Sequence, residues 1–442
     1  MMTIPTLPDL TRYQKAIVHL HPTQLSGRVV QVVGLTIEAV GVDAQVGEVC
    51  EILSFGTNIL LSEVVGFRNE RTLLMPLGDM QGIQPGSPVN PTRSVFRAPV
   101  GKVLLGRVLD GLGKPLDGKG PLGEVETMPI YAAAPHPLTR QPISQPLVTG
   151  VRAIDGLLTV GKGQRIGIFS GSGVGKSVLL GSLARNARSD ISVIGLVGER
   201  GREVQEFIER DLGPEGLKRS VVVVATSDQP ALVRMKAAWV ATTIAEHFRS
   251  QGADVIFMMD SVTRFAMAQR EVGLAIGEPP ASKGYTPSVF SLLPKLLERA
   301  GTSVNGSITG FYTVLVEGDD FNEPISDSVR SILDGHISLS RDLAARNHYP
   351  AVDVLRSISR VMPYVTTVEH RRYAAEMRKL MATYEKARDL VNIGAYVHGS
   401  DPEIDASLAA LSKINAFLQQ SAEEATPFDQ VETMLADAVA IG

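Results

Sequence analysis

The hydrophobic pattern of the chain changes character several times. Residues 1–22 place Leu10, Tyr13, Ile17 and Leu20 at helical spacing with polar residues between them, which predicts an amphipathic helix. Such a short helix is not stable alone in water, so its apolar stripe needs a surface to cover. We expect this segment to pack either on its own domain or on a partner.

Residues 23–95 show short apolar segments that predict β-strands. Gly, Asn or Pro turns separate these segments at close intervals, which is typical of a small β-barrel. The expected strands are 28–33, 36–39, 48–53, 60–65 and 72–77. Residues 96–150 are rich in Pro and Gly, and we expect them to form a linker that packs on the next domain.

Residues 151–365 alternate predicted strands with helices. Most of the strands are continuous apolar runs, which predicts a largely parallel sheet covered on both faces. The expected strands are 165–169, 192–197, 221–225, 255–259, 307–316 and 336–339. In residues 366–442 apolar positions recur with spacings of four and three, which predicts a helical C-terminal domain.

Composition narrows the class of protein. The 442 residues carry 43 basic and 47 acidic side chains, and a net charge of −4 argues against a mainly electrostatic nucleic-acid binder. The single cysteine, Cys50, allows no internal disulfide and is expected to be a small buried side chain in a reducing compartment. No apolar run approaches the roughly 18 residues of a membrane span, so we expect a cytoplasmic protein that meets membranes through partners.

The strongest chemical signal follows the predicted strand at 165–169. A Gly-rich turn leads to Lys176 and Ser177 directly before a helical pattern, which indicates a phosphate-binding loop. Glycines that take positive φ let backbone N–H groups point at phosphate oxygens, and the following helix adds its positive end. We expect Lys176 to reach the β- and γ-phosphates and the Ser177 hydroxyl to ligate Mg²⁺. The expected nucleotide-binding residues are Gly171, Ser172, Gly173, Val174, Gly175, Lys176, Ser177 and Val178, with Gly171, Gly173 and Gly175 at positive φ.

Two other predicted strands end in acidic residues. Asp260 closes the run 255–260 and is expected beside Mg²⁺, directly or through water, although an Asp at this place can also cap a helix. Glu199 follows another strand within Gly-Glu-Arg-Gly-Arg-Glu, where it is placed to orient or deprotonate a water molecule. Arg200 or Arg202 is placed to neutralise phosphate charge. Spacing alone leaves a solvated charged turn as the alternative.

Several motifs of the chain resemble those of one known family; they lie at 171–177, 198–203, 260–270, 277–285 and 349–360. The chain resembles the RecA-type ATPases of the rotary ATP synthase family, and most closely the type III protein-export ATPases of flagella and virulence injectisomes. The resemblance implies an N-terminal small β-barrel, a central RecA-like α/β P-loop NTPase domain with a largely parallel sheet, and a C-terminal α-helical domain. It also implies ATP and Mg²⁺ as cofactors.

The same resemblance implies roles for individual residues. Glu199 matches the catalytic carboxylate, Arg202 an arginine near the γ-phosphate, and Tyr349 a tyrosine that stacks on adenine. Arg360 matches an arginine finger that enters the neighbouring subunit's site, which implies a homohexameric ring. Non-catalytic subunits of rotary synthases carry Gln at the position of Glu199, so the acid indicates a catalytic chain. The usual motif starts with Gly, whereas this chain has Ser170 there. In this respect too the chain resembles the export branch, whose members carry a small non-Gly residue at that position.

The resemblance also implies partners. The N-terminal segment 1–22 is expected to meet a peripheral stator protein, and a central stalk protein to enter the pore past 277–285. The C-terminal domain is expected to face the export gate and to meet chaperone–substrate complexes. We therefore expect an ATPase ring, peripheral to the inner membrane, that releases chaperones and unfolds exported proteins. The runs 106–118 and 228–234 look more flagellar than injectisome-like.

Three other functions remain open at this point. A catalytic subunit of a rotary proton or sodium ATPase shares the scaffold but works with a paralogous chain. An RNA translocase resembling Rho would need a basic, aromatic barrel surface, and residues 27–91 contain only Phe55 and Phe67 as aromatics. A nucleotide-dependent scaffold without turnover would retain its activity when Glu199 is replaced.

Overall fold

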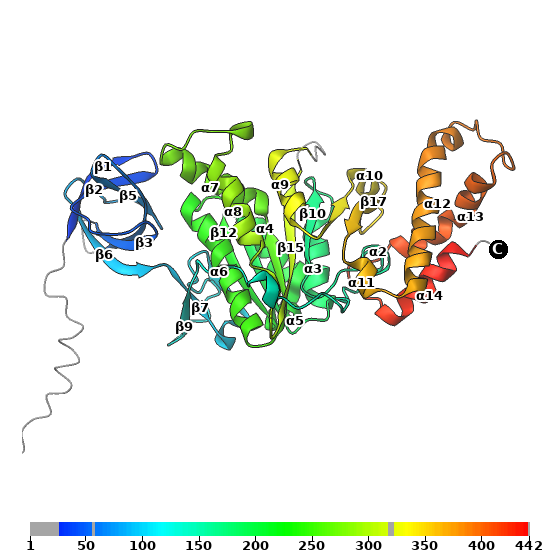
Figure 1. Cartoon of the computed structure of the whole chain (residues 1–442), viewed down its shortest axis with the longest axis horizontal. Coiled ribbons are helices and arrows are strands. Elements are labelled where there is room, and N and C mark those ends of the chain that lie inside the picture. Colours follow the sequence, from blue (N-terminus) through cyan, green and yellow to red (C-terminus); the bar gives the residue numbers. More distant parts are fainter. Residues whose placement is uncertain (1–25, 55–57, 317–321, 441–442) are drawn as a thin grey trace, which may run out of the picture. The chain divides into compact units, whose positions relative to one another are not determined.

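A computed structural model describes residues 26–54, 58–316 and 322–440, which form two compact units that divide after Val95 (Figure 1). Each unit is described by itself. The predicted helix within residues 1–22 and Phe55 lie outside the described residues.

The first unit is a closed six-stranded barrel in which the strands follow the order β1-β2-β5-β4-β3-β6. Alternate side chains point inward and form its core, and Cys50 is fully buried among them, as predicted. The sequence pattern missed the last strand because Pro88 and Pro91 interrupt it, and proline removes a backbone donor from a β-ladder. The strands are β1 (Gly27–Val33), β2 (Thr36–Val40), β3 (Glu48–Leu53), β4 (Ile59–Arg68), β5 (Arg71–Pro76) and β6 (Pro88–Val95).

The second unit is built on a sheet with strand order β17-β16-β10-β15-β13-β11-β12-β8, and β14 adds to β15. All neighbours from β16 to β8 are parallel, and β17 and β14 pair antiparallel. The prediction of a largely parallel sheet is therefore confirmed. The strands are β8 (Arg107–Asp110), β10 (Arg165–Ser170), β11 (Ile191–Glu199), β12 (Ser220–Thr226), β13 (Asp254–Asp260), β14 (Gly301–Thr302), β15 (Ser307–Leu315), β16 (Gly335–Leu339) and β17 (Val352–Ser359).

Helices cover both faces of this sheet, as its continuous apolar strands require. Along the central strands, Ile194, Val222 and Ile256 join the core that includes α3, while α6 packs along β11, β12 and β13. The helices are α2 (Arg152–Leu157), α3 (Lys176–Asn186), α4 (Gly201–Glu206), α5 (Gly213–Lys218), α6 (Ala231–Ser250), α7 (Val262–Ala275), α8 (Pro287–Leu297), α9 (Pro324–Ile332), α10 (Arg341–Ala345) and α11 (Met362–Val365). A π-helical turn at Phe207–Leu212 joins α4 to α5, and 3₁₀ turns occur at Lys102–Leu104, Pro137–Thr139 and Ser282–Gly284.

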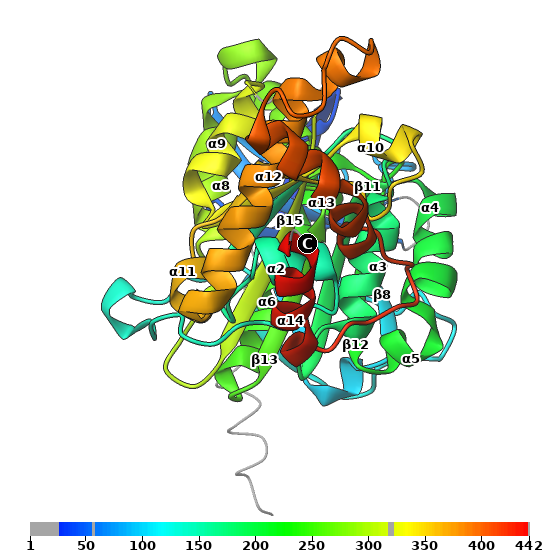
Figure 2. The same ribbon diagram turned by 90° about the vertical axis from the view of Figure 1, so that its right-hand side faces the viewer.

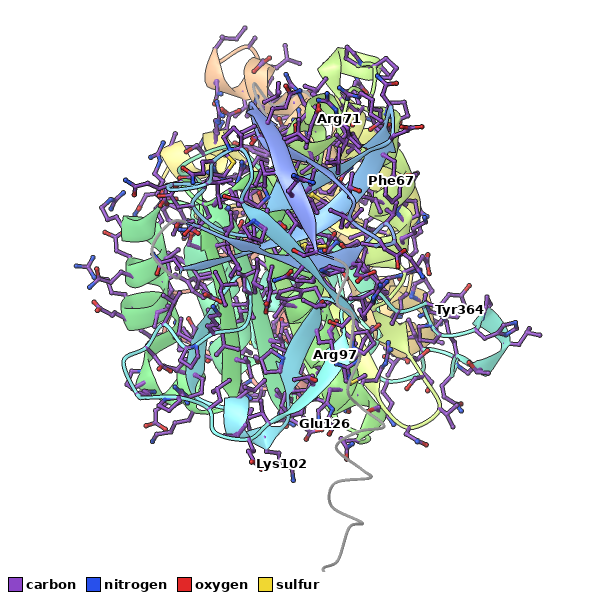
Figure 3. The ribbon with its side chains drawn as sticks, turned by 90° about the vertical axis from the view of Figure 1, so that its left-hand side faces the viewer. Phe67, Arg71, Arg97, Lys102, Glu126 and Tyr364 are labelled. Atoms are coloured by element: carbon purple, nitrogen blue, oxygen red, sulfur yellow. The ribbon has the colours of Figure 1, made fainter. Side chains whose placement is uncertain are left out.

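The segment 96–150, expected as a linker, contributes strands of its own. β7 (Arg97–Val100) and β9 (Glu126–Pro129) form a separate two-stranded sheet, on which Figure 3 labels Arg97 and Glu126. β8 extends the main sheet at its edge. The sequence pattern did not predict β8 because the strand has four residues and charged ends, and its ion pair between Arg107 and Asp117 at 2.7 Å depends on the fold.

Three helices form the C-terminal region: α12 (Val368–Asn392), α13 (Pro402–Leu418) and α14 (Phe428–Val439). α14 lies beside α2, as Figure 2 shows. Arg378 ties α12 to the sheet domain by donating to the carbonyl oxygens of Val354 and Leu157. Among the described helices, none has both the length and the apolar character that crossing a bilayer requires.

A buried ionic network fixes the segment 96–150 to the rest of the second unit. Arg299 is 0% exposed, donates to the backbone carbonyl of Ile130 at 2.5 Å, and forms a bidentate ion pair with the buried carboxylate of Glu246. Trp239, the single tryptophan, lies against this guanidinium at 5.5 Å. The network therefore joins α6 to the residue that follows β9.

We expect Arg299→Ala to lower the free energy of unfolding by about 3 kcal/mol, because it leaves Glu246 buried without its main cation. Urea denaturation followed by Trp239 fluorescence measures the loss. Lys218→Ala, which removes an exposed ion pair with Glu215, is the control and should leave the midpoint unchanged. A loss below about 1 kcal/mol for Arg299→Ala would contradict this account of the network.

Candidate active site

The Gly-rich loop connects β10 to α3 at the carboxyl end of the sheet. Gly173 and Gly175 have φ of 77° and 86°, so the loop takes the conformation for which glycine was expected there. Gly171 does not have positive φ, and this part of the expectation is wrong. At 171 a Cβ would lie 2.5 Å from the guanidinium of Arg341, so a larger residue there would have to displace the end of that side chain. The α3 helix begins at Lys176, so its free N–H groups face the loop.

Lys176 holds two acidic side chains from two neighbouring strands. Its Nζ lies 2.5 Å from Oδ1 of Asp260, at the end of β13, and 3.7 Å from Oε1 of Glu199, at the end of β11. Both carboxylates are buried, with 4% and 6% of their surfaces exposed. Burial acts to lower the pKa of Lys176, but the charges of Asp260 and Glu199 outweigh it and raise that pKa. Three residues predicted from separate motifs therefore form one charged cluster.

Thr313 on β15 also contacts the carboxylate of Asp260. Its hydroxyl donates to Oδ1 of Asp260 at 2.6 Å. The side chain that caps α7 is Ser261, whose hydroxyl accepts from the backbone N–H of Arg264. Asp260 thus faces Lys176 and Thr313 and does not act as the helix cap that the sequence left as an alternative.

The pKa of Glu199 is strongly shifted by its surroundings. Burial, followed by the charge of Asp260, raises the pKa of Glu199 to about 7, although Lys176 and Arg264 act in the opposite direction. The Oε1 atom accepts no hydrogen bond from any described residue. Gly198, with φ of 74°, turns the strand end so that Arg264 packs against it, and a Cβ there would lie 2.8 Å from the Arg264 side chain. A buried acid that titrates near neutrality is suited to accept a proton.

The residues present fit a Mg²⁺ ion that shares its ligands with a nucleotide. Mg²⁺ prefers oxygen ligands and is usually held by one or two carboxylates together with phosphates and water. The site offers the carboxylate of Asp260 and the Ser177 hydroxyl in the first turn of α3, and Oε1 of Glu199 is buried and makes no hydrogen bond to a described residue, although two cations lie near it. No described group of three or more His, Cys, Asp or Glu side chains is arranged to hold a metal by itself. The donor set therefore suits a metal bound together with phosphate.

A pocket of about 430 Å³ opens beside the phosphate loop. Tyr349 lines it, and its ring would lie 3.3 Å from a Cβ at Gly175, so the ring rests against the loop. Val178, predicted as a nucleotide-binding residue, also lines this pocket and is 44% exposed. The remaining lining comes from the start of α3 and from Gln420, Ser421 and Ala422. An aromatic ring and apolar walls next to a phosphate loop are suited to a nucleotide base.

The structure does not bring every predicted arginine to this cluster. Arg202 lies on α4 with its side chain 70% exposed, and its Nη1 atom pairs with Glu206 at 2.6 Å. Arg200 is 74% exposed and pairs with Glu203. The cation that reaches Glu199 is Arg264, whose Nε lies 3.2 Å from Oε1. The predicted contact of Arg202 with the γ-phosphate stays a prediction.

Arg360 lies at the amino ends of the parallel strands, whereas the phosphate loop of the same chain lies at their carboxyl ends. It follows β17, which runs antiparallel to β16, and its backbone N–H donates to the carbonyl of Asp334, whose own N–H donates to Arg165 at the start of β10. The loop begins after Ser170, five residues further along β10, or roughly 16 Å at about 3.3 Å per residue. Arg360 therefore lies far from the phosphate loop of its own chain, and it is exposed.

Sequence reasoning assigned no role to Arg264 or Thr313. Arg264 stands within the motif that begins at Asp260, but its contact with Glu199 depends on the packing of α7 against β11. Thr313 is one polar residue in the apolar run of β15, and that break in the run is a signal that a buried hydrogen bond was needed there. Arg264 meets Glu199, and Thr313 meets Asp260, because of the order of the strands in the sheet, which no local sequence pattern encodes.

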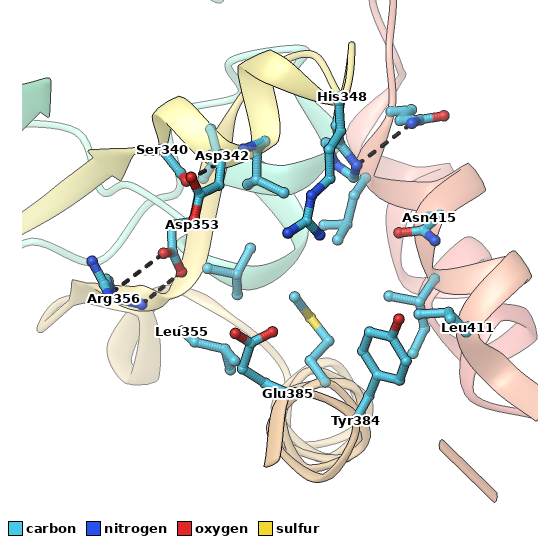
Figure 4. A pocket seen from close by; sticks show the side chains of 18 of the residues that line it. Ser340, Asp342, His348, Asp353, Leu355, Arg356, Tyr384, Glu385, Leu411 and Asn415 are labelled. Atoms are coloured by element: carbon cyan, nitrogen blue, oxygen red, sulfur yellow. Dashed lines mark hydrogen bonds and ion pairs between the residues drawn. The ribbon is translucent and has the colours of Figure 1, made fainter. Parts of the chain in front are cut away.

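A second pocket, of about 420 Å³, lies between β17, α10, α12 and α13 (Figure 4). Tyr384, Glu385 and Asn415 point toward it, and a dashed line marks the contact between His348 and Gln419. His348 and Gln419 line this pocket, whereas their neighbours Tyr349 and Gln420 line the pocket at the phosphate loop. The two cavities thus share one wall.

Comparison with known proteins identifies three regions of the chain. Residues 29–93 match the β-barrel domain of the ATP synthase alpha/beta family, and residues 150–359 match its nucleotide-binding domain. Residues 366–437 match the C-terminal domain of the EscN ATPase of type III secretion systems.

Whole-chain relatives agree with these matches. The chain is 56% identical to a flagellum-specific ATP synthase of Bacillus subtilis, over 90% of this chain and 91% of the relative. It is 50% identical to a type 3 secretion system ATPase of Xanthomonas euvesicatoria, over 92% of this chain and 93% of the relative. The structure of the assembled ATPase EscN from enteropathogenic E. coli superimposes with a TM-score of 0.89 at 49% identity, over 94% of this chain and all of that one. The chain therefore belongs to the family of flagellum-specific ATP synthases and type III secretion ATPases, which the resemblance in its motifs predicted.

Proposed function

We propose that this chain is a Mg²⁺-dependent ATPase that acts as a homohexameric ring and energises type III protein export. The observation that carries the proposal is the cluster of Lys176, Glu199 and Asp260 at the end of a Gly-rich loop. It places a cation for the phosphates and a buried acid for proton transfer within about 4 Å of each other.

Each side chain has a separate task in hydrolysis. Lys176 and the N–H groups of the loop bind the terminal phosphates, and Thr313 holds Asp260 in place. Glu199 orients the attacking water and accepts its proton, and Arg264 fixes the position of Glu199. Ser177 and Asp260 would hold Mg²⁺, which supplies charge neutralisation for the phosphate oxygens when bound.

Arg360 supports the ring. An arginine finger stabilises the charge that spreads over the transferred phosphoryl group. Arg360 lies far from the phosphate loop of its own chain, which supports a role in the site of another subunit. Tyr349 is placed to stack on the adenine base from within the same chain.

The export role rests on the relatives. The flagellar relative from Bacillus subtilis is more similar to this chain than the secretion relative from Xanthomonas, and this favours the flagellum. A related structure shows EscN with its central stalk EscO, which supports a stalk partner at the pore segment 277–285. A stator at residues 1–22, and the export gate and chaperone–substrate complexes at 366–442, complete the proposed partners, with chaperone release and substrate unfolding as the work done.

Glu199→Gln is expected to lower the ATPase rate by about 10²- to 10⁴-fold while ATP binding persists, because the amide cannot accept the proton from water. Lys176→Ala is expected to remove both binding and turnover. A Mg²⁺-ATPase assay with the purified chain and calorimetric ATP binding measure the two effects, and circular dichroism checks the fold. Wild-type turnover in Glu199→Gln would show that Glu199 is not the base, and a wild-type chain that binds ATP without turnover would favour a scaffold over an enzyme.

The rate should depend on pH through Glu199. Only the ionised carboxylate accepts a proton, and its pKa is raised to about 7, so kcat/KM is expected to fall as the pH drops below about 7 and to level off above it. Arg264→Gln removes a charge that lowers this pKa, so the midpoint should move to higher pH. Arg202→Gln, whose guanidinium pairs with Glu206, should leave the midpoint in place. If the midpoint of the pH dependence of kcat/KM is unchanged in Arg264→Gln, Glu199 is not the base.

Arg360→Ala is expected to lower turnover by roughly 10³- to 10⁵-fold, the usual contribution of an arginine finger. Mixing this variant with Lys176→Ala should restore part of the activity, because some interfaces then combine an intact phosphate loop with an intact Arg360. Turnover of the mixed rings at several ratios, compared with each variant alone, measures this. If mixing restores nothing, or if Arg360→Ala retains full turnover, Arg360 does not act between subunits.

A further inference from the structure

The connector between α13 and α14 forms one wall of the pocket at the phosphate loop. Gln420, Ser421 and Ala422 face Tyr349 and the start of α3 across this pocket. The connector has no helix or strand of its own, so other parts of the chain must hold its backbone in place. The position of this wall therefore depends on the side chains that hold the connector, which we call its ties.

Gln420 is one of these ties. Its side chain is buried, and its Oε1 accepts from the backbone N–H of Arg152 at 2.8 Å. Its Nε2 donates to the carbonyls of Gly150 at 2.7 Å and Glu424 at 2.8 Å, and its backbone N–H donates to the carbonyl of Tyr349 at 2.9 Å. Because the amide is engaged at both ends, Gln420 holds the connector rather than offering a hydrogen bond to a ligand.

Arg152, the first residue of α2, is the second tie. Its guanidinium is buried and donates to the carbonyls of Phe417 and Gln419, at 2.9 Å and 2.5 Å, and to the Thr426 hydroxyl at 3.1 Å. It also forms an ion pair with Glu424. These contacts reach from the end of α13 to the residues before α14, so one side chain contacts both ends of the connector, while Arg185 on α3 donates to the carbonyl of Ala422 in its middle.

We propose that Arg152 and Gln420 are positioning residues for the nucleotide base, which they serve by holding the connector against the phosphate loop. This inference rests on the proposed function, because it takes the 430 Å³ pocket as the base site. The pocket wall contributes packing contacts, and these decline steeply when a gap of even 0.5–1 Å opens. The triphosphate is held instead by the loop, α3 and Lys176, which neither tie touches. Loss of a tie should therefore weaken binding of the base and spare binding of the phosphates.

The test compares two ligands on the full chain with Mg²⁺ present: a non-hydrolysable ATP analogue and inorganic tripolyphosphate, which has no base. We expect Gln420→Ala to weaken the analogue by about tenfold in calorimetric titration, within the range of roughly 5- to 150-fold that one stacked base contributes. Tripolyphosphate affinity should change by less than about twofold. Arg152→Ala should act in the same way, and Arg152→Lys, which keeps the charge but loses the planar fork, should restore only part of the affinity.

Arg378→Ala is the matched control, because Arg378 also ties the C-terminal helices to the sheet domain but lies outside the base pocket. It should leave the affinities for both ligands unchanged. If Gln420→Ala weakens both ligands equally, or neither, the positioning role is wrong. If the wild-type chain binds neither ligand, the proposed ATPase function itself fails, which is a separate result.

Discussion

The ammonium of Lys176 between the carboxylates of Glu199 and Asp260 is the interaction on which the rest of the molecule depends. Each of these charges, buried alone, would cost several kcal/mol, so each is tolerable only because the others are present. The parallel sheet brings them together, since the carboxyl ends of β11, β13 and β10 lie at one edge. The same low exposure that makes the cluster costly raises the pKa of Glu199 into the range useful for proton transfer.

Because most of its strands are parallel, the sheet has a carboxyl edge, where those strands end, and an amino edge, where they begin. The carboxyl edge holds the phosphate loop and the acids, and the antiparallel strand β17 carries Arg360 to the amino edge. A cation and a phosphate site that lie at opposite edges of one sheet cannot meet within one subunit, but they can meet between neighbours in a ring. In the proposed hexamer, catalysis and assembly thus have the same geometric cause.

The C-terminal helices are joined to the site through the wall that separates the two cavities. His348 and Gln419 face one cavity, and Tyr349 and Gln420 face the other. A change in the position of α13 would therefore move the surface next to the base as well as the surface in Figure 4. For the proposed partners of the C-terminal region, such a link would offer a physical route to the nucleotide at the phosphate loop, because both would act on one short connector.

The sequence by itself determined the barrel, the α/β domain with its phosphate loop and the helical C-terminal region, although not the strands within residues 96–150. Apolar runs fixed the buried strands β10 to β13, and the glycines before Lys176 fixed the phosphate loop, because these features depend on local backbone and burial preferences. The tertiary structure alone decided that β8 completes the sheet, that Arg264 rather than Arg202 contacts Glu199, and that Gln420 forms a wall of the pocket at the phosphate loop. These contacts join residues on different elements, and strand order and helix packing, which no short stretch of sequence encodes, bring them together.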